Sequence, residues 1–154
     1  MATLTYLTTT HFDFGALDLL PKMLRQEGIT KPLIATDAGL VKAGVVETVT
    51  KAIGADYAPV IFDGTPGNPT EEAVKAAFDL YTAEGCDGVV ALGGGSSMDL
   101  GKAVALLAGS GGPLEQYDPL AGGAKLIKQV APVIAVPTTS GTGSEVSVGF
   151  VIIL

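Results

Sequence analysis

One stretch of the chain, from Val89 to Ala103, constrains the fold more than any other. It begins with four apolar residues, continues with the three glycines Gly93 to Gly95, and then turns into a sequence that favours a helix. We therefore expect a buried strand, a tight loop and a helix N-terminus. Glycines let the backbone approach a ligand closely because no Cβ stands in the way. The free amides and the dipole of the helix then favour a phosphate, so the stretch predicts a cradle for a pyrophosphate.

Two better-known glycine loops have a different spacing. The dinucleotide fingerprint has glycine at its sixth place, where this chain has Met98 when the count starts at Gly93. A P-loop has Ser or Thr after its Gly-Lys pair, and here Ala103 follows Lys102. A plain turn between a strand and a helix, without a ligand, is the alternative interpretation.

Apolar strands and amphipathic helices alternate along the chain. We expect extended segments at residues 3–10, 32–36, 55–61, 89–92, 132–137 and 146–154, and helices at residues 16–27, 41–53, 71–84 and from the glycine loop to Ala108. This alternation predicts an α/β fold with a Rossmann-like parallel sheet, helices on both faces and right-handed crossovers. The first and last extended segments are expected to form a β-hairpin at one edge.

Composition narrows the class of protein. The 154 residues suffice for one domain, and only 16% are charged, which fits a buried parallel sheet or a chain covered by a second domain or subunit. A net charge of −7 and few aromatic residues argue against nucleic acid as a partner. No apolar run approaches the length of a membrane span. The single cysteine, Cys86, fits the reducing cytoplasm, where we expect the protein. Residues 150–154 are all apolar, so we expect the chain to stop within an element.

Asp37 follows the predicted strand at residues 32–36, where an α/β strand delivers side chains to the ligand edge. A carboxylate there can accept both hydroxyls of a ribose and would repel a 2′-phosphate, which favours NAD over NADP. The alternative is an N-terminal cap for the following helix. In a standard Rossmann unit this acid follows the glycine loop. Here it precedes the loop, so we expect a different topology.

Three further groups lie at predicted strand-to-helix junctions. Asn68, Pro69 and Thr70 could border an adenosine, or form a turn followed by a helix cap. The hydroxyl-rich run from Thr138 to Ser144 could hold a nicotinamide ribose or carboxamide, since it should meet the glycine loop at the same edge. Ser96 and Asp99 have nearly the spacing of a capping box, so Asp99 is either a cap or a ligand contact. Lys102 is expected to be solvated.

The chain offers no catalytic or metal-binding set. His11 is its one histidine, and a lone histidine is more often a packed or surface residue than a ligand. Iron and zinc sites need three or four N, S or O ligands, for which we find no His or Cys cluster.

The two long motifs together resemble the iron-containing (group III) alcohol dehydrogenase family. They are the run from Gly93 to Ala103 and the run from Pro137 to Val146, and the shorter segments 14–16, 36–40 and 68–70 fit the same family in the same order. The resemblance covers essentially the whole chain but only the N-terminal half of such an enzyme. It implies that residues 1–154 form an NAD(P)-binding domain. It also implies that a helical C-terminal domain, absent from this chain, holds Fe²⁺ or Zn²⁺ through one Asp and three His.

The family also implies roles for individual residues. Asp37 would select NAD, Asn68 to Thr70 would lie near the adenosine, and Asp99 would lie near the cleft between the domains. The pyrophosphate would bind at Gly94, Gly95, Ser96 and Ser97. The ribose and nicotinamide side would be lined by Thr138, Thr139, Thr142, Ser144 and Val146.

The activity implied for the intact enzyme is hydride transfer between a small alcohol or aldehyde and the nicotinamide, with the metal as a Lewis acid. No catalytic residue is expected in this chain, which alone should be inactive, and the enzyme is expected to be a homodimer or higher oligomer. A glycerol dehydrogenase or dehydroquinate synthase relative is disfavoured by the run from Thr138 to Glu145. A stand-alone nucleotide-binding or interaction domain without catalysis is the alternative.

Overall fold

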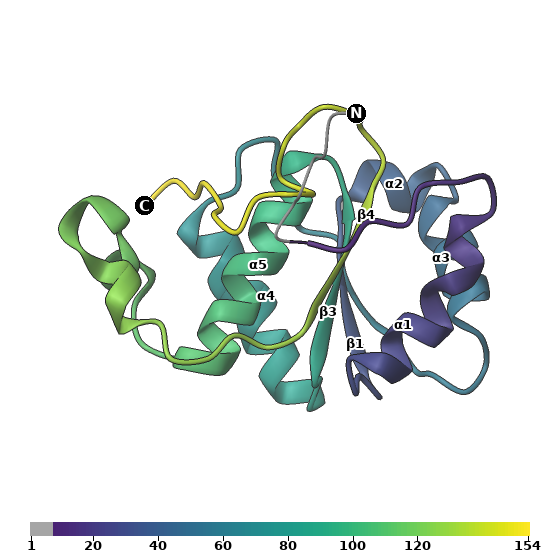
Figure 1. Ribbon diagram of the computed structural model, residues 1–154, viewed down its shortest axis with the longest axis horizontal. Coiled ribbons are helices and arrows are strands. Elements are labelled where there is room, and N and C mark those ends of the chain that lie inside the picture. Colours follow the sequence, from purple (N-terminus) through teal and green to yellow (C-terminus); the bar gives the residue numbers. More distant parts are fainter. Residues whose placement is uncertain (1–7) are drawn as a thin grey trace, which may run out of the picture.

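The computed structural model describes residues 8–154 and shows an open α/β sheet (Figure 1). The strands are β1 (Pro32–Ala35), β2 (Val60–Phe62), β3 (Gly88–Gly93) and β4 (Val133–Pro137), all parallel, in the order β2-β1-β3-β4. The α-helices are α1 (Leu20–Gln26), α2 (Ala38–Lys42), α3 (Val45–Ile53), α4 (Glu71–Glu84) and α5 (Gly95–Ser110). Four 3₁₀ turns are η1 (Ala16–Leu19), η2 (Leu114–Tyr117), η3 (Pro119–Ala121) and η4 (Gly123–Leu126).

Helices cover both faces of the sheet, as the alternation of elements predicted. Alternate residues of β1 and β3 point to opposite sides, so Leu33 and Val89 pack with α4 and α5, while Ile34 and Val90 pack with α1 and α3. Figure 1 shows these two helical layers on either side of the sheet. All residues of β1 and β3 are buried, as expected for central strands of a parallel sheet.

Several helix ends lie at the residues predicted from local sequence signals. Thr70 caps α4 by accepting a hydrogen bond from the amide of Ala73, and Gly85 ends this helix in the left-handed conformation with φ 66°. Pro21 opens α1 rather than interrupting it. Gly44, with φ 77°, separates α2 from α3.

The prediction of a strand over residues 55–61 was too long, and β2 begins at Val60. Its partner β1 is only four residues long and pairs three of them, Leu33 to Ala35, with β2. Residues 55–59 therefore have no neighbouring strand to bond with, and Pro59 lacks the amide that a ladder needs.

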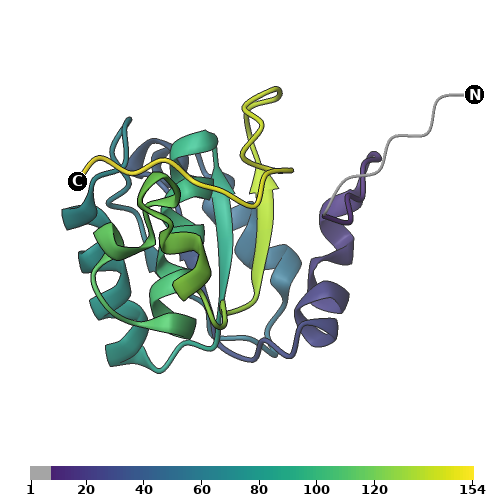
Figure 2. The ribbon, with the colours of Figure 1, turned by 60° about the vertical axis from the view of Figure 1, so that its left-hand side comes forward.

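The predicted edge hairpin is absent from the described part of the chain. Most of the segment at residues 3–10 lies outside that part, and Thr8 to Thr10 form no strand. Residues 146–154 cross the helical layer of α4 and α5 (Figure 2) and make a single bridge, between Ile153 and Thr70. Phe150 and Ile152 pack against the core on that side, so this segment is held by contacts with helices rather than by a strand partner.

Candidate nucleotide-binding site

The order in which successive strands are added to the sheet reverses between β1 and β3. The chain passes from β1 to β2 on one side and then crosses β1 to place β3 on the other. In open α/β sheets, ligands bind outside the carboxyl ends of the strands at such a switch point. Asp37 follows β1 and the glycine loop follows β3, so the two candidate groups flank this point. The order is not the standard Rossmann one, as the position of Asp37 predicted.

The glycine loop and the hydroxyl-rich run meet at this edge, as predicted. The amide of Thr138 donates to the carbonyl of Gly93 at 2.9 Å. A Cβ added to Gly94 would lie 3.4 Å from Thr139 Oγ1, and one added to Gly95 would lie 3.3 Å from Ser144 Oγ. Side chains at these two positions would fill the gap between the loops, so the glycines keep it open.

The first turn of α5 presents unpaired backbone donors. The residue at the N-cap is Gly94, which has no side chain to cap the helix, and the first turn contains no acidic residue. Within the described residues, the amides of Gly95, Ser96 and Ser97 have no hydrogen-bond acceptor. Three free amides at the N-terminus of a 16-residue helix form an environment that favours an anion.

Of the two interpretations of Asp99, the capping box with Ser96 does not form, because α5 begins at Gly95 and both residues lie inside the helix. The hydroxyl of Ser96 donates to the carbonyl of Gly67 at 2.6 Å, which ties the loop before α4 to the glycine loop. Asp99 is 9% exposed, and its Oδ2 accepts the amide of Val151 at 3.0 Å. Ser97 is buried beside the backbone of Gly93.

Lys102 is not merely solvated, contrary to the sequence prediction. Its ammonium donates to the carbonyls of Ser144 (2.5 Å), Ser147 (2.8 Å) and Gly149 (3.0 Å), and to the hydroxyl of Ser147 (3.1 Å). Burial lowers the pKa of Lys102, although the charges of Asp99 and Glu145 oppose this shift. The three-residue spacing of Asp99 and Lys102 places them on one helix face and was the only local sign of a shared role. Their partners are distant in sequence, so the sequence did not reveal what they bind.

Asp37 is a helix cap with spare hydrogen-bonding capacity. Its Oδ1 accepts the amide of Leu40 at 3.0 Å, so the capping interpretation is confirmed. No described residue donates to its Oδ2, and the residue is only half-buried. The carboxylate can therefore cap α2 and accept a ligand hydroxyl at the same time.

The segment before α4 lies beside the C-terminal residues. Asn68 is exposed and Pro69 is buried, while the carbonyl of Pro69 accepts the amide of Ile153 at 2.9 Å. Thr70 uses its hydroxyl as the cap of α4. The capping interpretation of Thr70 is therefore confirmed, and contacts of Asn68 to Thr70 with an adenosine remain a prediction.

The hydroxyl-rich run is largely exposed. Thr138, Thr139 and Thr142 are exposed, whereas Ser144 and Val146 are half-buried. The Thr142 hydroxyl accepts the amide of Ser144 at 3.2 Å and donates to Glu145 Oε2 at 2.7 Å. This bond lowers the pKa of Glu145. The run is thus internally ordered while most of its hydroxyls stay accessible.

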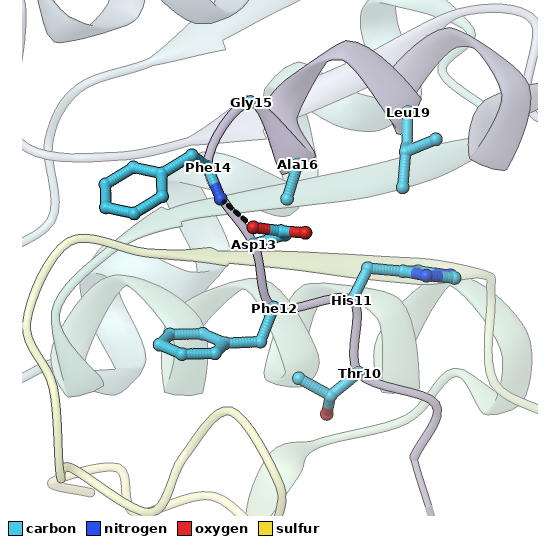
Figure 3. Close-up of a pocket in the computed structure, with 8 residues that line it drawn as sticks. All are labelled: Thr10, His11, Phe12, Asp13, Phe14, Gly15, Ala16 and Leu19. Atoms are coloured by element: carbon cyan, nitrogen blue, oxygen red, sulfur yellow. Dashed lines mark hydrogen bonds between the residues drawn. The ribbon is translucent and has the colours of Figure 1, made fainter.

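A hollow near the N-terminus lies apart from the strand ends that carry the candidate site. Figure 3 shows an open hollow lined by one continuous run, Thr10 to Ala16 with Leu19, in which His11 and Asp13 are the titratable side chains. It lies on the segment preceding α1, away from the glycine loop. In the described range 8–154, no three His, Cys, Asp or Glu side chains gather closely enough to hold a metal ion. None of the helices in that range is long and apolar enough to cross a membrane.

The fold defines an open α/β domain with a glycine-rich loop at the switch point of its sheet. In this class of protein, ligands bind outside the carboxyl ends of the strands. The chain belongs to the iron-containing alcohol dehydrogenase family, whose sequence profile matches residues 8–154.

Three relatives illustrate the similarity. A 4-hydroxybutyrate dehydrogenase of Cupriavidus necator is 51% identical over all of this chain and 40% of its own length. An NAD-dependent methanol dehydrogenase of Bacillus methanolicus is 41% identical over 85% of this chain and 34% of its own length. The crystal structure of sulfoacetaldehyde reductase from Bifidobacterium kashiwanohense in complex with NAD⁺ superposes with a TM-score of 0.80 at 26% identity, over 96% of this chain and 38% of that one. The chain therefore spans about 40% of the length of these relatives or less.

Proposed function

We propose that this chain is the NAD-binding domain of a metal-dependent alcohol dehydrogenase, which in its intact form interconverts an alcohol and an aldehyde. The observation that supports this best is the group of unpaired amides at Gly95 to Ser97, beside the hydroxyl-rich run at the switch point. The gap kept open by the glycines fits the phosphates of a dinucleotide. The names of two relatives, one NAD-dependent and one in complex with NAD⁺, support NAD as the cofactor.

In this proposal each group of residues has one task. The amides of Gly95 to Ser97 hold the pyrophosphate, with Gly94 leaving room for it. Asp37 accepts the hydroxyls of the adenine ribose, and Asn68 to Thr70 border the adenosine. The nicotinamide side is oriented by Thr138, Thr139, Thr142, Ser144 and Val146, with Asp99 near it. Bound NAD supplies the hydride acceptor for the oxidation of the alcohol.

The metal and the catalytic step are assigned to the part of the relatives that this chain does not span. Fe²⁺ or Zn²⁺ there would polarise the alcohol oxygen as a Lewis acid. Residues 1–154 would then bind the cofactor without turning over substrate. Oxidation of short primary alcohols by this chain with added Fe²⁺ or Zn²⁺ would contradict that division.

Calorimetry with NAD⁺, NADP⁺ and ADP-ribose tests the cofactor assignment. We expect NAD⁺ and ADP-ribose to bind, and NADP⁺ to bind at least about tenfold more weakly, since a carboxylate facing a 2′-phosphate is repulsive. Asp37→Asn keeps the helix cap but removes the charge, so it should reduce this discrimination without lowering the melting temperature.

Asp56→Asn is the matched control. It removes the same charge from an exposed position that precedes the amino end of β2, whereas Asp37 follows the carboxyl end of β1. Its discrimination should equal that of the original chain. Failure of the original chain to bind any of the three ligands would refute the cradle, whereas equal affinity for NAD⁺ and NADP⁺ would refute only the role of Asp37.

We also propose that the intact enzyme is a homodimer or higher oligomer located in the cytoplasm. The fully exposed aromatic residues Phe12 and Phe14 support a surface near the N-terminus that is covered in the intact enzyme. The buried free thiol of Cys86 is consistent with a reducing compartment. Light scattering would measure the oligomeric state, and cell fractionation would establish the location.

A further inference from the structure

The ammonium of Lys102 is the centre of a dense polar contact between α5 and the C-terminal segment. It faces four oxygens, the carbonyls of Ser144, Ser147 and Gly149 and the hydroxyl of Ser147, at 2.5–3.1 Å. An ammonium has three N–H donors, so these oxygens saturate it. Residues 138–149 contain no helix or strand, and their carbonyls therefore lack the regular partners that secondary structure would supply.

Asp99 provides a second attachment one helical turn earlier. Its Oδ2 accepts the amide of Val151, whereas Lys102 donates to carbonyls two to seven residues before it. The two side chains thus bind both kinds of backbone group on one segment. Asp99 accepts a hydrogen bond from an N–H group, and Lys102 donates hydrogen bonds to C=O groups. Both belong to α5, whose first turn bears the unpaired amides.

We propose that Lys102 is a positioning residue for the nicotinamide side of the site: it fixes the shape of residues 144–149 against α5. This inference rests on the cofactor assignment above. Ser144 shows the connection, because Lys102 binds its carbonyl while its hydroxyl lies at the edge of the gap beside Gly95. Without the ammonium, the half-buried carbonyl of Ser144 and the more exposed carbonyls of Ser147 and Gly149 lose their shared donor, and the segment moves away from the helix. The amides of the cradle and the carboxylate of Asp37 are left as they were.

The test compares NAD⁺ with ADP, which has the adenosine and the two phosphates but no nicotinamide half. Lys102→Met keeps the apolar stem and removes the ammonium. We expect the Kd of NAD⁺ to rise about tenfold or more, since hydrogen bonds from a charged donor are lost, while the Kd of ADP changes less than about twofold. Lys75→Met is the control, because Lys75 is exposed and pairs with Asp79 on its own helix. It should change neither Kd.

Hydrogen exchange gives a readout that needs no ligand. In Lys102→Met, backbone amides of residues 144–151 should exchange about tenfold faster or more, while amides of β3 keep their protection. Unchanged exchange in this segment would overturn the positioning role. An equal rise in the Kd of ADP and of NAD⁺ would also overturn it, because Lys102 would then act on the phosphates. Failure of the original chain to bind either ligand would instead refute the cofactor assignment, and the exchange result would still decide whether Lys102 holds the segment.

Discussion

Gly101 lies where α5 packs directly against β3, so a substitution there tests how α5 is held against the sheet. A Cβ added to Gly101 would lie 2.7 Å from Ala91 Cβ and 3.2 Å from Val89 Cγ1. The valine methyl can move by rotation, but Ala91 Cβ is fixed to the central strand β3. Gly101→Ala must therefore push the helix away from the strand.

Two opposing effects determine the change in the free energy of unfolding. Replacing glycine by alanine inside a helix stabilises by about 1 kcal/mol. Overpacking a well-packed core costs about 1–3 kcal/mol. We expect the second effect to prevail, so that Gly101→Ala destabilises the chain by about 1 kcal/mol, or about 2–4 °C in melting temperature for a chain of this length.

A double-mutant cycle with Ala91→Gly separates the two effects. Ala91→Gly removes the atom that the new Cβ would meet, so in that background Gly101→Ala should stabilise the chain by up to about 1 kcal/mol. The coupling free energy between the two substitutions should then be about 1–3 kcal/mol, measured by urea unfolding followed by circular dichroism. A coupling below about 0.5 kcal/mol would refute the close contact as the reason for glycine at this position.

Two further substitutions test contacts between loops at the two ends of the strands. Burial alone would raise the pKa of Asp87, but hydrogen bonds from the Thr30 hydroxyl and from the amides of Lys31 and Thr30 outweigh this effect and lower the pKa below its usual value. Asp87→Asn should therefore cost about 1 kcal/mol at pH 7 after allowance for solvent exposure. Because the pKa is lowered in the folded state, this difference from the original chain should be full above the unfolded value of about 4 and vanish as the pH falls through the folded value, which urea unfolding at several pH values would measure. Ser96→Ala removes the donor to the Gly67 carbonyl and should cost about 1 kcal/mol in the same assay, and an unchanged unfolding midpoint would show that this bond does not hold the loop.

The parts of the fold that the sequence could predict depend on local signals. Val89 to Gly93 form a buried strand because five apolar or small residues leave no polar face. The caps at Asp37 and Thr70 follow from short oxygen-bearing side chains immediately before a helix. Even the meeting of the glycine loop with the hydroxyl-rich run was predictable, since both follow strands of one parallel sheet.

The parts that could not be predicted depend on partners distant in sequence. Residues 146–154 are mostly apolar and rich in β-branched side chains, which favours a strand, but the sheet offers them no strand partner. Their amides and carbonyls are bound instead by Asp99 and Lys102, about 50 residues earlier in the chain. Nothing in the local pattern distinguishes a lysine that binds carbonyls from one that points into solvent, so the role of Lys102 required the three-dimensional arrangement.

The glycine loop shows why comparing spacings alone was insufficient. The dinucleotide fingerprint uses its third glycine to bring helix and strand together, and this chain has Met98 at that place. Met98 is fully buried in the core between the sheet and the helices α4 and α5, so a side chain is accommodated there. The close approach occurs one turn later, at Gly101, where the gap to Ala91 excludes even a methyl group. A helix that begins beside a gap lined by glycines and lies tightly against its strand is therefore achieved here with a different spacing of glycines.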